Sequence, residues 1–236
     1  MTEATILTFA CALAFAATHY LVPKLHFLSA VPRSRWLSLS GGVAVAYVFM
    51  HLLPELAEHE RALAKEGHPS EILVYALAMS GLAVFYGLEQ YVQTAKRSES
   101  RIESEAFWIH LGAFALYNVL IGYFLLHREE VGIASLAMYF VAMALHFVTN
   151  DFGMHQQHRS LYDNKGRWVL ALAVLSGWLL GQLVELPEIW LIATFSFLAG
   201  SVVLNVLKEE LPEERQSSFL AFAGGLALYA TLLAAL

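Results

Sequence analysis

The chain reads Gly42-Val-Ala-Val-Ala-Tyr-Val-Phe-Met-His51-Leu-Leu-Pro54-Glu55 in its first quarter, with no Asp, Glu, Lys or Arg before the last residue. With its flanks this run covers 37–57 and, as a helix, would cross the ~30 Å hydrocarbon core of a bilayer. Similar runs recur along the chain, and short polar links separate them. The sequence therefore predicts an all-α protein with eight transmembrane helices, at 4–22, 37–57, 70–93, 106–127, 131–153, 167–185, 188–208 and 217–236.

The composition also points to the membrane. Of the 236 residues, 58% are hydrophobic and 14% are charged, whereas soluble domains are about one quarter charged. So low a content of polar residues suits a chain whose partner is the lipid bilayer. The sequence has no basic patch of the kind that binds nucleic acid. The single cysteine, Cys11, excludes a disulfide framework. We expect one transmembrane domain over 1–236 in the plasma (inner) membrane, with the first run retained because no basic segment precedes it.

Basic residues predict the orientation. Eleven of the 14 Lys and Arg residues fall in or beside links on one side of the predicted helices, and cytoplasmic links are the ones enriched in Lys and Arg. The N-terminus is therefore expected outside. The eleven residues are Lys24, Arg33, Arg35, Lys96, Arg97, Arg101, Arg159, Lys165, Arg167, Lys208 and Arg215.

Helix seven resembles helix two. The two align without a gap at an offset of 158, and identical residues coincide at Gly42 and Gly200, Leu53 and Leu211, Pro54 and Pro212, and Glu55 and Glu213. Chance similarity between apolar helices is the alternative. A repeat would be inverted, because the two helices run in opposite directions. It predicts a 3 + 2 + 3 transporter layout, with repeat one at 4–93, a central pair at 106–153 and repeat two at 167–236. His51 and Glu55 then mark the outer mouth, and Glu209 and Glu213 the inner one.

Polar residues cluster in the central pair, where buried ionisable groups suggest function. Counting depth at 1.5 Å per residue places Asn118 and His146 within about one turn of each other, with Asn150 one turn further along. These three side chains could surround one cation, and Asp151 lies nearer the cytoplasmic end. The alternative is that His and Asn join helices by hydrogen bonds. His19 in helix one and Glu89 in helix three are expected to reach the inner interface.

On these motifs the chain resembles the ZIP (Zrt/Irt-like) family of divalent-metal transporters. The resemblance rests on His51-Leu-Leu-Pro-Glu55, on Phe85-Tyr-Gly-Leu-Glu89 and on the segment from Ala199-Gly200 to Leu211-Pro-Glu213. It implies Zn²⁺ or a similar ion as cargo, a metal site on helices four and five, and a homodimer.

The family's metal motifs are only partly present. Where the family has His-Asn-Phe-x-Asp/Glu-Gly on helix four, this chain has Tyr117-Asn118-Val-Leu-Ile121-Gly122. Where the family has His-Glu-Ile-Pro-Glu/His on helix five, it has His146-Phe147-Val-Thr-Asn150, followed by Asp151. Tyr117, Ile121 and Phe147 therefore depart from the family's ligands.

Three functions remain open at this level. The first is a divalent-metal permease that works by an elevator-like motion of helices one, four, five and six, as the resemblance implies. The second is a transport-incompetent relative acting as a regulator, scaffold or metal sensor. The third is a carrier of a neutral or anionic substrate, which would tolerate the missing carboxylates. An enzyme is not expected, because the sequence contains no nucleophile–base pair and no complete metal triad.

Overall fold

The computed structural model describes residues 3–25, 35–65, 72–96, 100–128, 132–210 and 218–235. Every regular element in these ranges is helical. In chain order they are α1 (Glu3–Leu21), η1 (Val22–Lys24), α2 (Arg35–Tyr47), η3 (Val48–Leu52), α3 (Leu53–Lys65), α4 (Leu73–Lys96), α5 (Ser100–Phe124), α6 (Ile133–Gln157), α7 (Arg159–Leu161), η4 (Tyr162–Gly166), α8 (Arg167–Leu183), α9 (Glu188–Asn205), η5 (Val206–Glu210) and α10 (Phe219–Ala234).

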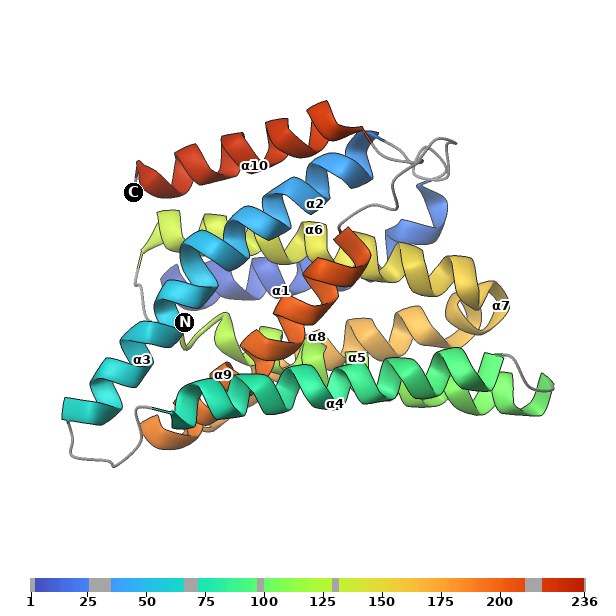
Figure 1. The fold of residues 1–236 in the computed structure, drawn as a ribbon, viewed down its shortest axis with the longest axis horizontal. Coiled ribbons are helices and arrows are strands. Elements are labelled where there is room, and N and C mark those ends of the chain that lie inside the picture. Colours follow the sequence, from blue (N-terminus) through green and yellow to red (C-terminus); the bar gives the residue numbers. More distant parts are fainter. Residues whose placement is uncertain are drawn as a thin grey trace.

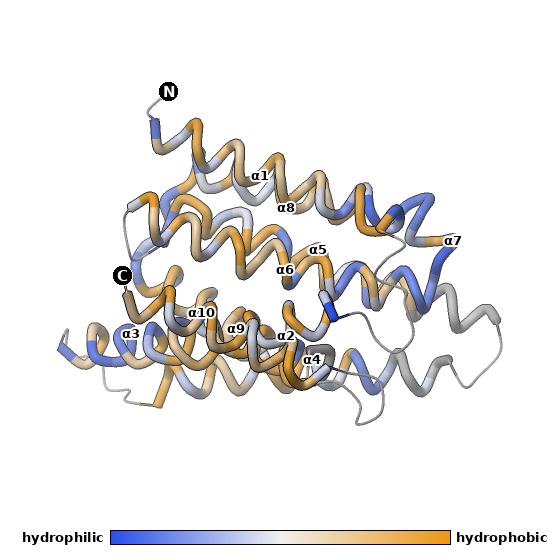
Figure 2. Tube along the Cα trace, turned by 90° about the horizontal axis from the view of Figure 1, so that it is seen from above, coloured by the Kyte–Doolittle hydropathy of each residue, from blue (hydrophilic) through white to orange (hydrophobic). Residues whose placement is uncertain are grey.

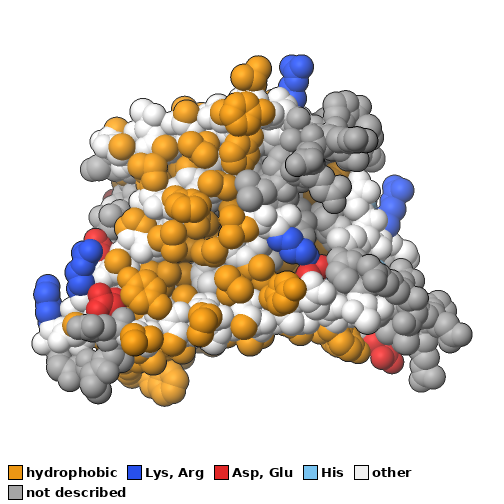
Figure 3. Space-filling model, viewed as in Figure 1, with side chains coloured by type: hydrophobic (Ala, Val, Ile, Leu, Met, Phe, Trp, Pro, Cys, Tyr) orange, Lys and Arg blue, Asp and Glu red, His pale blue; other side chains and the backbone are white. Residues whose placement is uncertain are grey.

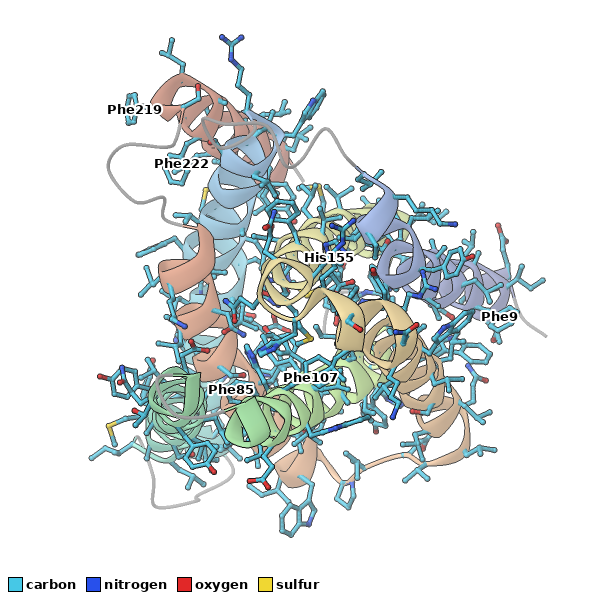
Figure 4. The ribbon with its side chains drawn as sticks, turned by 90° about the vertical axis from the view of Figure 1, so that its right-hand side faces the viewer. Phe9, Phe85, Phe107, His155, Phe219 and Phe222 are labelled. Atoms are coloured by element: carbon cyan, nitrogen blue, oxygen red, sulfur yellow. The ribbon has the colours of Figure 1, made fainter. Side chains whose placement is uncertain are left out.

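The helices form three layers. Helices α1 and α8 make one layer, α5 and α6 the middle one, and α2, α4, α9 and α10 the third (Figures 2 and 4). Most run roughly along the longest axis of the molecule, whereas α9 and the continuous α2–α3 helix cross it obliquely (Figure 1). Both ends of the chain lie toward the same end of that axis. The middle layer is therefore covered on both sides. A buried site would lie in this middle layer.

The described residues include seven helices that are long and apolar enough to cross a membrane. Helix α10 is also apolar but shorter. Apolar side chains cover much of the face formed by the third layer, and most charged groups on that face lie toward its margins (Figure 3). The prediction of an all-helical membrane protein is confirmed, because water would not solvate such a surface.

Glycines bring α2 and α10 into backbone contact. A Cβ added at Gly42 would overlap the backbone oxygen of Phe222, which lies beside α2 (Figure 4), and one added at Gly225 would overlap that of Leu39. Small residues at a helix crossing allow the close approach that gives transmembrane helices their van der Waals attraction. Helix α10 is thus held closely against α2 at this crossing.

The α4–α9 pair is built in the same way. A Cβ at Gly200 would overlap the backbone oxygen of Ala78, and one at Gly81 would overlap that of Phe197. In each of the two helix pairs, both partner helices therefore contribute one glycine to the crossing. Neither partner can move closer or carry a larger residue there without displacing backbone.

Two helices of the third layer contain π-helical turns ahead of a proline. The turn η3 ends two residues before Pro54, and Leu53 N–H bonds Val48 O across five residues. The turn η5 spans Val206–Glu210, two residues before Pro212, which lies outside the described residues. Proline has no N–H and its ring clashes with the preceding turn, so the α-helical hydrogen-bond pattern is interrupted there.

Several helix boundaries differ from the sequence prediction by a few residues, and the largest difference is at the end of helix two. The charged segment from Glu58 onward was expected to link helices two and three, but it continues as helix α3 to Lys65. Leu56, His59 and Leu63 form its buried face. Their three- and four-residue spacing is that of an amphipathic helix, so high charge alone does not indicate a loop.

Candidate functional site

A buried hydrogen-bonded group joins α1 to both helices of the middle layer. His19 of α1 lies with Nδ1 at 2.6 Å from Asp151 Oδ2 on α6 and Nε2 at 2.7 Å from Asn118 Oδ1 on α5. The three residues have relative exposures of 0%, 1% and 2% in the order His19, Asp151, Asn118. We call them the His19 triad.

The hydrogen bonds determine the number of protons in the His19 triad. Asn118 Nδ2 donates to Phe114 O, so Asn118 presents its oxygen to His19, and Nε2 of His19 must donate. The 2.6 Å contact between Nδ1 and the Asp151 carboxyl requires a second proton between them. The His19–Asp151 pair is therefore electrically neutral as a whole, whichever of the two atoms holds that proton.

Neighbouring aromatic residues hold His19 in place. Tyr162 OH, on η4, donates to the His19 backbone oxygen at 3.2 Å. The Phe147 ring lies with its centroid 4.7 Å from that of His19. Phe147 is one of the departures from the family's ligands, and it fills with an apolar ring the space beside an imidazole. Water is thereby kept from one side of the His19 triad.

A second buried pair lies on α6. Asn150 Nδ2 lies 2.8 Å from His146 Nε2. An amide nitrogen only donates, so Nε2 accepts and His146 carries its proton on Nδ1. His146 Nδ1 and Asn150 Oδ1 are both buried without a hydrogen-bond partner among the described residues. Each residue of this pair therefore has one buried polar atom without a hydrogen bond, and such atoms are rare in folded interiors.

The other two departures from the family's ligands also line this region. The Tyr117 ring lies 5.5 Å from the His146 ring, centroid to centroid. Ile121 is fully buried, and its backbone oxygen accepts a hydrogen bond from Tyr139 OH at 3.0 Å. Where the family has an imidazole and a carboxylate, this chain therefore has a phenol and an alkyl group.

The predicted site residues are thus divided between two groups. Asn118 and Asp151 bond His19, while His146 and Asn150 bond each other, and within the described part of the chain no hydrogen bond joins the two groups. The expected ring of Asn118, His146 and Asn150 around one cation is therefore not the arrangement observed. Among the described residues, no group of three or more His, Cys, Asp and Glu is placed to hold a metal ion.

His19 was missed at the sequence level. It was expected to reach the inner interface, whereas it is fully buried. A usable signal exists: Thr8, Ala12, Phe15 and His19, the buried residues of α1, repeat at three- and four-residue spacing on one helix face. A histidine on an otherwise apolar buried face needs polar partners from neighbouring helices.

Comparison with protein-family models, with curated proteins and with solved structures found no match to this chain. Its function is therefore inferred from its own residues and their geometry.

The predicted mouths are placed as follows. His51 Nε2 lies 3.5 Å from Glu55 Oε2, and both residues line a cavity between α3, α6 and α9. The backbone of Glu209 belongs to η5, but its side chain and the whole of Glu213 lie outside the described residues. The pair predicted for the outer mouth is thus in contact, and the pair predicted for the inner mouth falls mostly on undescribed residues.

A different charged cluster lies between α4, α5 and η5. Glu89 Oε1 is 2.5 Å from Lys208 Nζ, and Glu89 Oε2 is 3.7 Å from His110 Nε2. Beside it is a cavity of about 280 Å³, counted with the space open to solvent, which Asn150 also lines. Glu89 was expected to reach the interface by itself; it binds instead the ammonium group of Lys208, from the second predicted repeat.

Proposed function

We propose that the protein is a ZIP-like membrane carrier of a divalent cation, and that Zn²⁺ is the cation its donor atoms suit best. The observation that carries the proposal is the buried polar layer formed by the His19 triad and the His146–Asn150 pair. Two imidazoles, one carboxylate and two amides lie there within α1, α5 and α6. Imidazole nitrogen and carboxylate oxygen are common Zn²⁺ ligands, and ionisable residues inside a membrane generally serve a substrate path.

Two features of the fold support the 3 + 2 + 3 inverted-repeat layout. The π-helical turns at Val48–Leu52 and Val206–Glu210 are separated by the same 158 residues that align helices two and seven. The glycine contacts pair helix two with helix eight and helix seven with helix three, which are equivalent pairs under such a repeat. An even number of crossings, with α10 as the eighth, agrees with both termini lying at one end (Figure 1).

The arrangement of the helices in layers is consistent with an elevator-like transport motion. The buried polar side chains lie on α1, α5 and α6, and α8 packs beside them. These four helices form two of the three helix layers (Figure 2). Helices α2, α4, α9 and α10 form the third layer, whose glycine-packed pairs make a firm support. A carrier needs one group of helices to shift against another so that the site opens to each side of the membrane in turn.

Binding a cation would require the buried side chains to rearrange. Rotating the Asn150 amide by half a turn would let His146 Nε2–H donate to Oδ1, which leaves the Nδ1 lone pair for a cation. Asp151 would become available once His19 gives up the proton between them. In the conformation described, these candidate ligands are hydrogen-bonded to one another instead of facing a cation.

Orientation, location and assembly follow the sequence arguments. We propose an outside N-terminus from the distribution of Lys and Arg, and a location in the plasma membrane. The proposed homodimer follows from the family resemblance. Cross-linking of the intact protein in its membrane measures the assembly.

Cysteine labelling in intact cells tests the orientation. In a Cys11→Ala background, which removes the single native cysteine, Thr2→Cys and His68→Cys fall on the predicted outer side and should react with a membrane-impermeant maleimide. Ser98→Cys falls on the predicted cytoplasmic side and should react only after the cells are permeabilised. The reverse pattern of labelling would contradict the outside N-terminus.

Flux into proteoliposomes tests the proposed activity. We expect saturable Zn²⁺ and Cd²⁺ uptake by the native protein, reduced at least tenfold in His146→Ala and in Asp151→Asn, because losing a metal-site group typically costs about 10–100-fold. Thr231→Ala, a change on the exposed face of α10, is the matched control and should transport normally.

A transport-incompetent relative is the second candidate. The His19 triad favours it, because an internal imidazole already occupies Asn118 and Asp151. Folded native protein with no flux above empty liposomes would reject the carrier proposal and support this one. Uptake that is equal in the native protein and both site variants would place the cation path elsewhere.

A further inference from the structure

Two basic side chains meet on one tyrosine ring where α1 and α8 adjoin. Lys24 Nζ, on η1, lies 4.1 Å from the centroid of the Tyr20 ring, and Arg167 Cζ, at the start of α8, lies 4.8 Å from the same centroid. We call Lys24 and Arg167 the basic pair. Hydrophilic residues gather at this end of the α1–α8 layer, next to α7 (Figure 2). The aromatic ring attracts each cation, but the two like charges repel each other.

The described part of the chain does not neutralise the basic pair. Among these residues, neither Lys24 nor Arg167 forms an ion pair or donates a hydrogen bond, and Arg167 Nε is buried without an acceptor. Asp163, one turn earlier, lies with Oδ1 3.3 Å from His155 Nε2 instead. The undescribed residues 26–34 contain no Asp or Glu. A buried N–H on a charged group is costly without an acceptor, and an anion from outside the chain would supply one.

The surroundings of the basic pair are those of a membrane interface. Tyr20 and Trp168 are both exposed, and their ring centroids lie 5.4 Å apart. Tyrosine and tryptophan are enriched at the level of the lipid headgroups. Further along α8, away from Arg167, Leu172 is exposed as well. The surface therefore places positive charge at the level of the headgroups and an apolar side chain at the level of the acyl chains.

We infer that the basic pair binds the phosphate of an anionic phospholipid, whose acyl chains lie along α8 beside Leu172. A phosphate group has several charged oxygens, so a guanidinium and an ammonium can bind it together. The basic pair lies at the end of the fold that the distribution of Lys and Arg predicts to be cytoplasmic, where membranes carry anionic lipids. The cationic headgroup of a zwitterionic lipid would be repelled there. Lipid binding at this site does not depend on whether the protein carries a cation.

Native mass spectrometry of the delipidated protein in detergent tests this site, because it resolves single bound lipids. Palmitoyl-oleoyl phosphatidylglycerol is the probe. We expect saturable binding that weakens at least tenfold in the double variant Lys24→Gln with Arg167→Gln, since each Lys or Arg near an anionic lipid surface contributes about fivefold. Each single variant should bind with intermediate affinity.

The matched control removes two positive charges from the opposite end of the molecule. Arg61 and Lys65 are exposed on α3, which lies at the other end of the long axis from α7 (Figure 1). Arg61→Gln with Lys65→Gln should leave phosphatidylglycerol binding unchanged. Palmitoyl-oleoyl phosphatidylcholine should bind the native protein more weakly, and the loss of the basic pair should not weaken it further. Thermal unfolding establishes that each variant is folded.

Glycerol phosphate separates a lipid site from a site for a soluble phosphate ester. It has the phosphate without the acyl chains, so a large excess should not displace phosphatidylglycerol from the native protein. Displacement would overturn the inference by assigning the basic pair to a soluble phosphate. Equal phosphatidylglycerol binding by the native protein and by folded variants of the basic pair would overturn it as well.

Discussion

Replacing His19 by Ala is expected to lower the free energy of unfolding by about 3–5 kcal/mol, the usual cost of removing one partner of a buried ion pair. The substitution leaves the Asp151 carboxyl, 1% exposed, without its 2.6 Å contact and leaves Asn118 Oδ1 without a donor. Neither group reaches water to compensate. Reversible unfolding in mixed detergent micelles, followed by circular dichroism, measures the change.

Leu13→Ala is the matched control for that experiment. Leu13 lies on the same helix, but its side chain is exposed at the surface of the fold, and such substitutions usually change stability by about 0.5 kcal/mol or less. The double variant His19→Ala with Asp151→Ala should be less destabilised than the sum of the single variants, because contacting residues couple by about 0.5–3 kcal/mol. A His19→Ala loss no larger than that of Leu13→Ala, or strictly additive effects, would contradict the described pairing.

The second large effect is expected at adjacent glycines of α10. A Cβ at Gly225 would overlap the backbone oxygen of Leu39, whereas one at Gly224 meets nothing within 4 Å. Gly225→Ala must push α10 away from α2, and overpacking of this kind typically costs about 1–3 kcal/mol. Gly224→Ala should stabilise the helix by up to about 1 kcal/mol, because alanine is the better helix former.

The two glycine variants differ by one position and one methyl group, so their comparison isolates the helix crossing. Thermal unfolding and the yield of monodisperse protein are the measurements. Gly81→Ala on α4, whose Cβ would overlap the backbone oxygen of Phe197, should behave like Gly225→Ala. If Gly224→Ala and Gly225→Ala prove equally stable, the close α2–α10 contact is absent.

Much of the helical organisation was predictable because membrane helices must be long and continuously apolar. Helix ends were less predictable. Helix α3 continues through Glu58 to Lys65 because Leu56 and Leu63 bury one of its faces, and hydropathy averages over both faces. The π-helical turn η3 could be anticipated only in part, since Pro54 marks an interruption without specifying its form.

The candidate site was predictable in its residue types but not in its pairings. Helical spacing placed His146 and Asn150 on one face of α6, and they do bond. Asn118 and Asp151 instead bond His19, which is 99 and 132 residues away from them in the sequence. Counting depth along single helices gives no information on which helices are neighbours. The packing of α1 beside α5 and α6 determined which side chains bond each other.

The neutrality of the His19 triad also has an electrical consequence. A charge that crosses the membrane field gains or loses about 2.3 kcal/mol per 100 mV. The His19–Asp151 pair has no net charge, and a histidine that carries one ring proton, such as His146, has none either. Displacing this layer between the two faces of the bilayer would therefore move almost no gating charge. Without bound cargo, such a transition would proceed at the same rate in a polarised and a depolarised membrane.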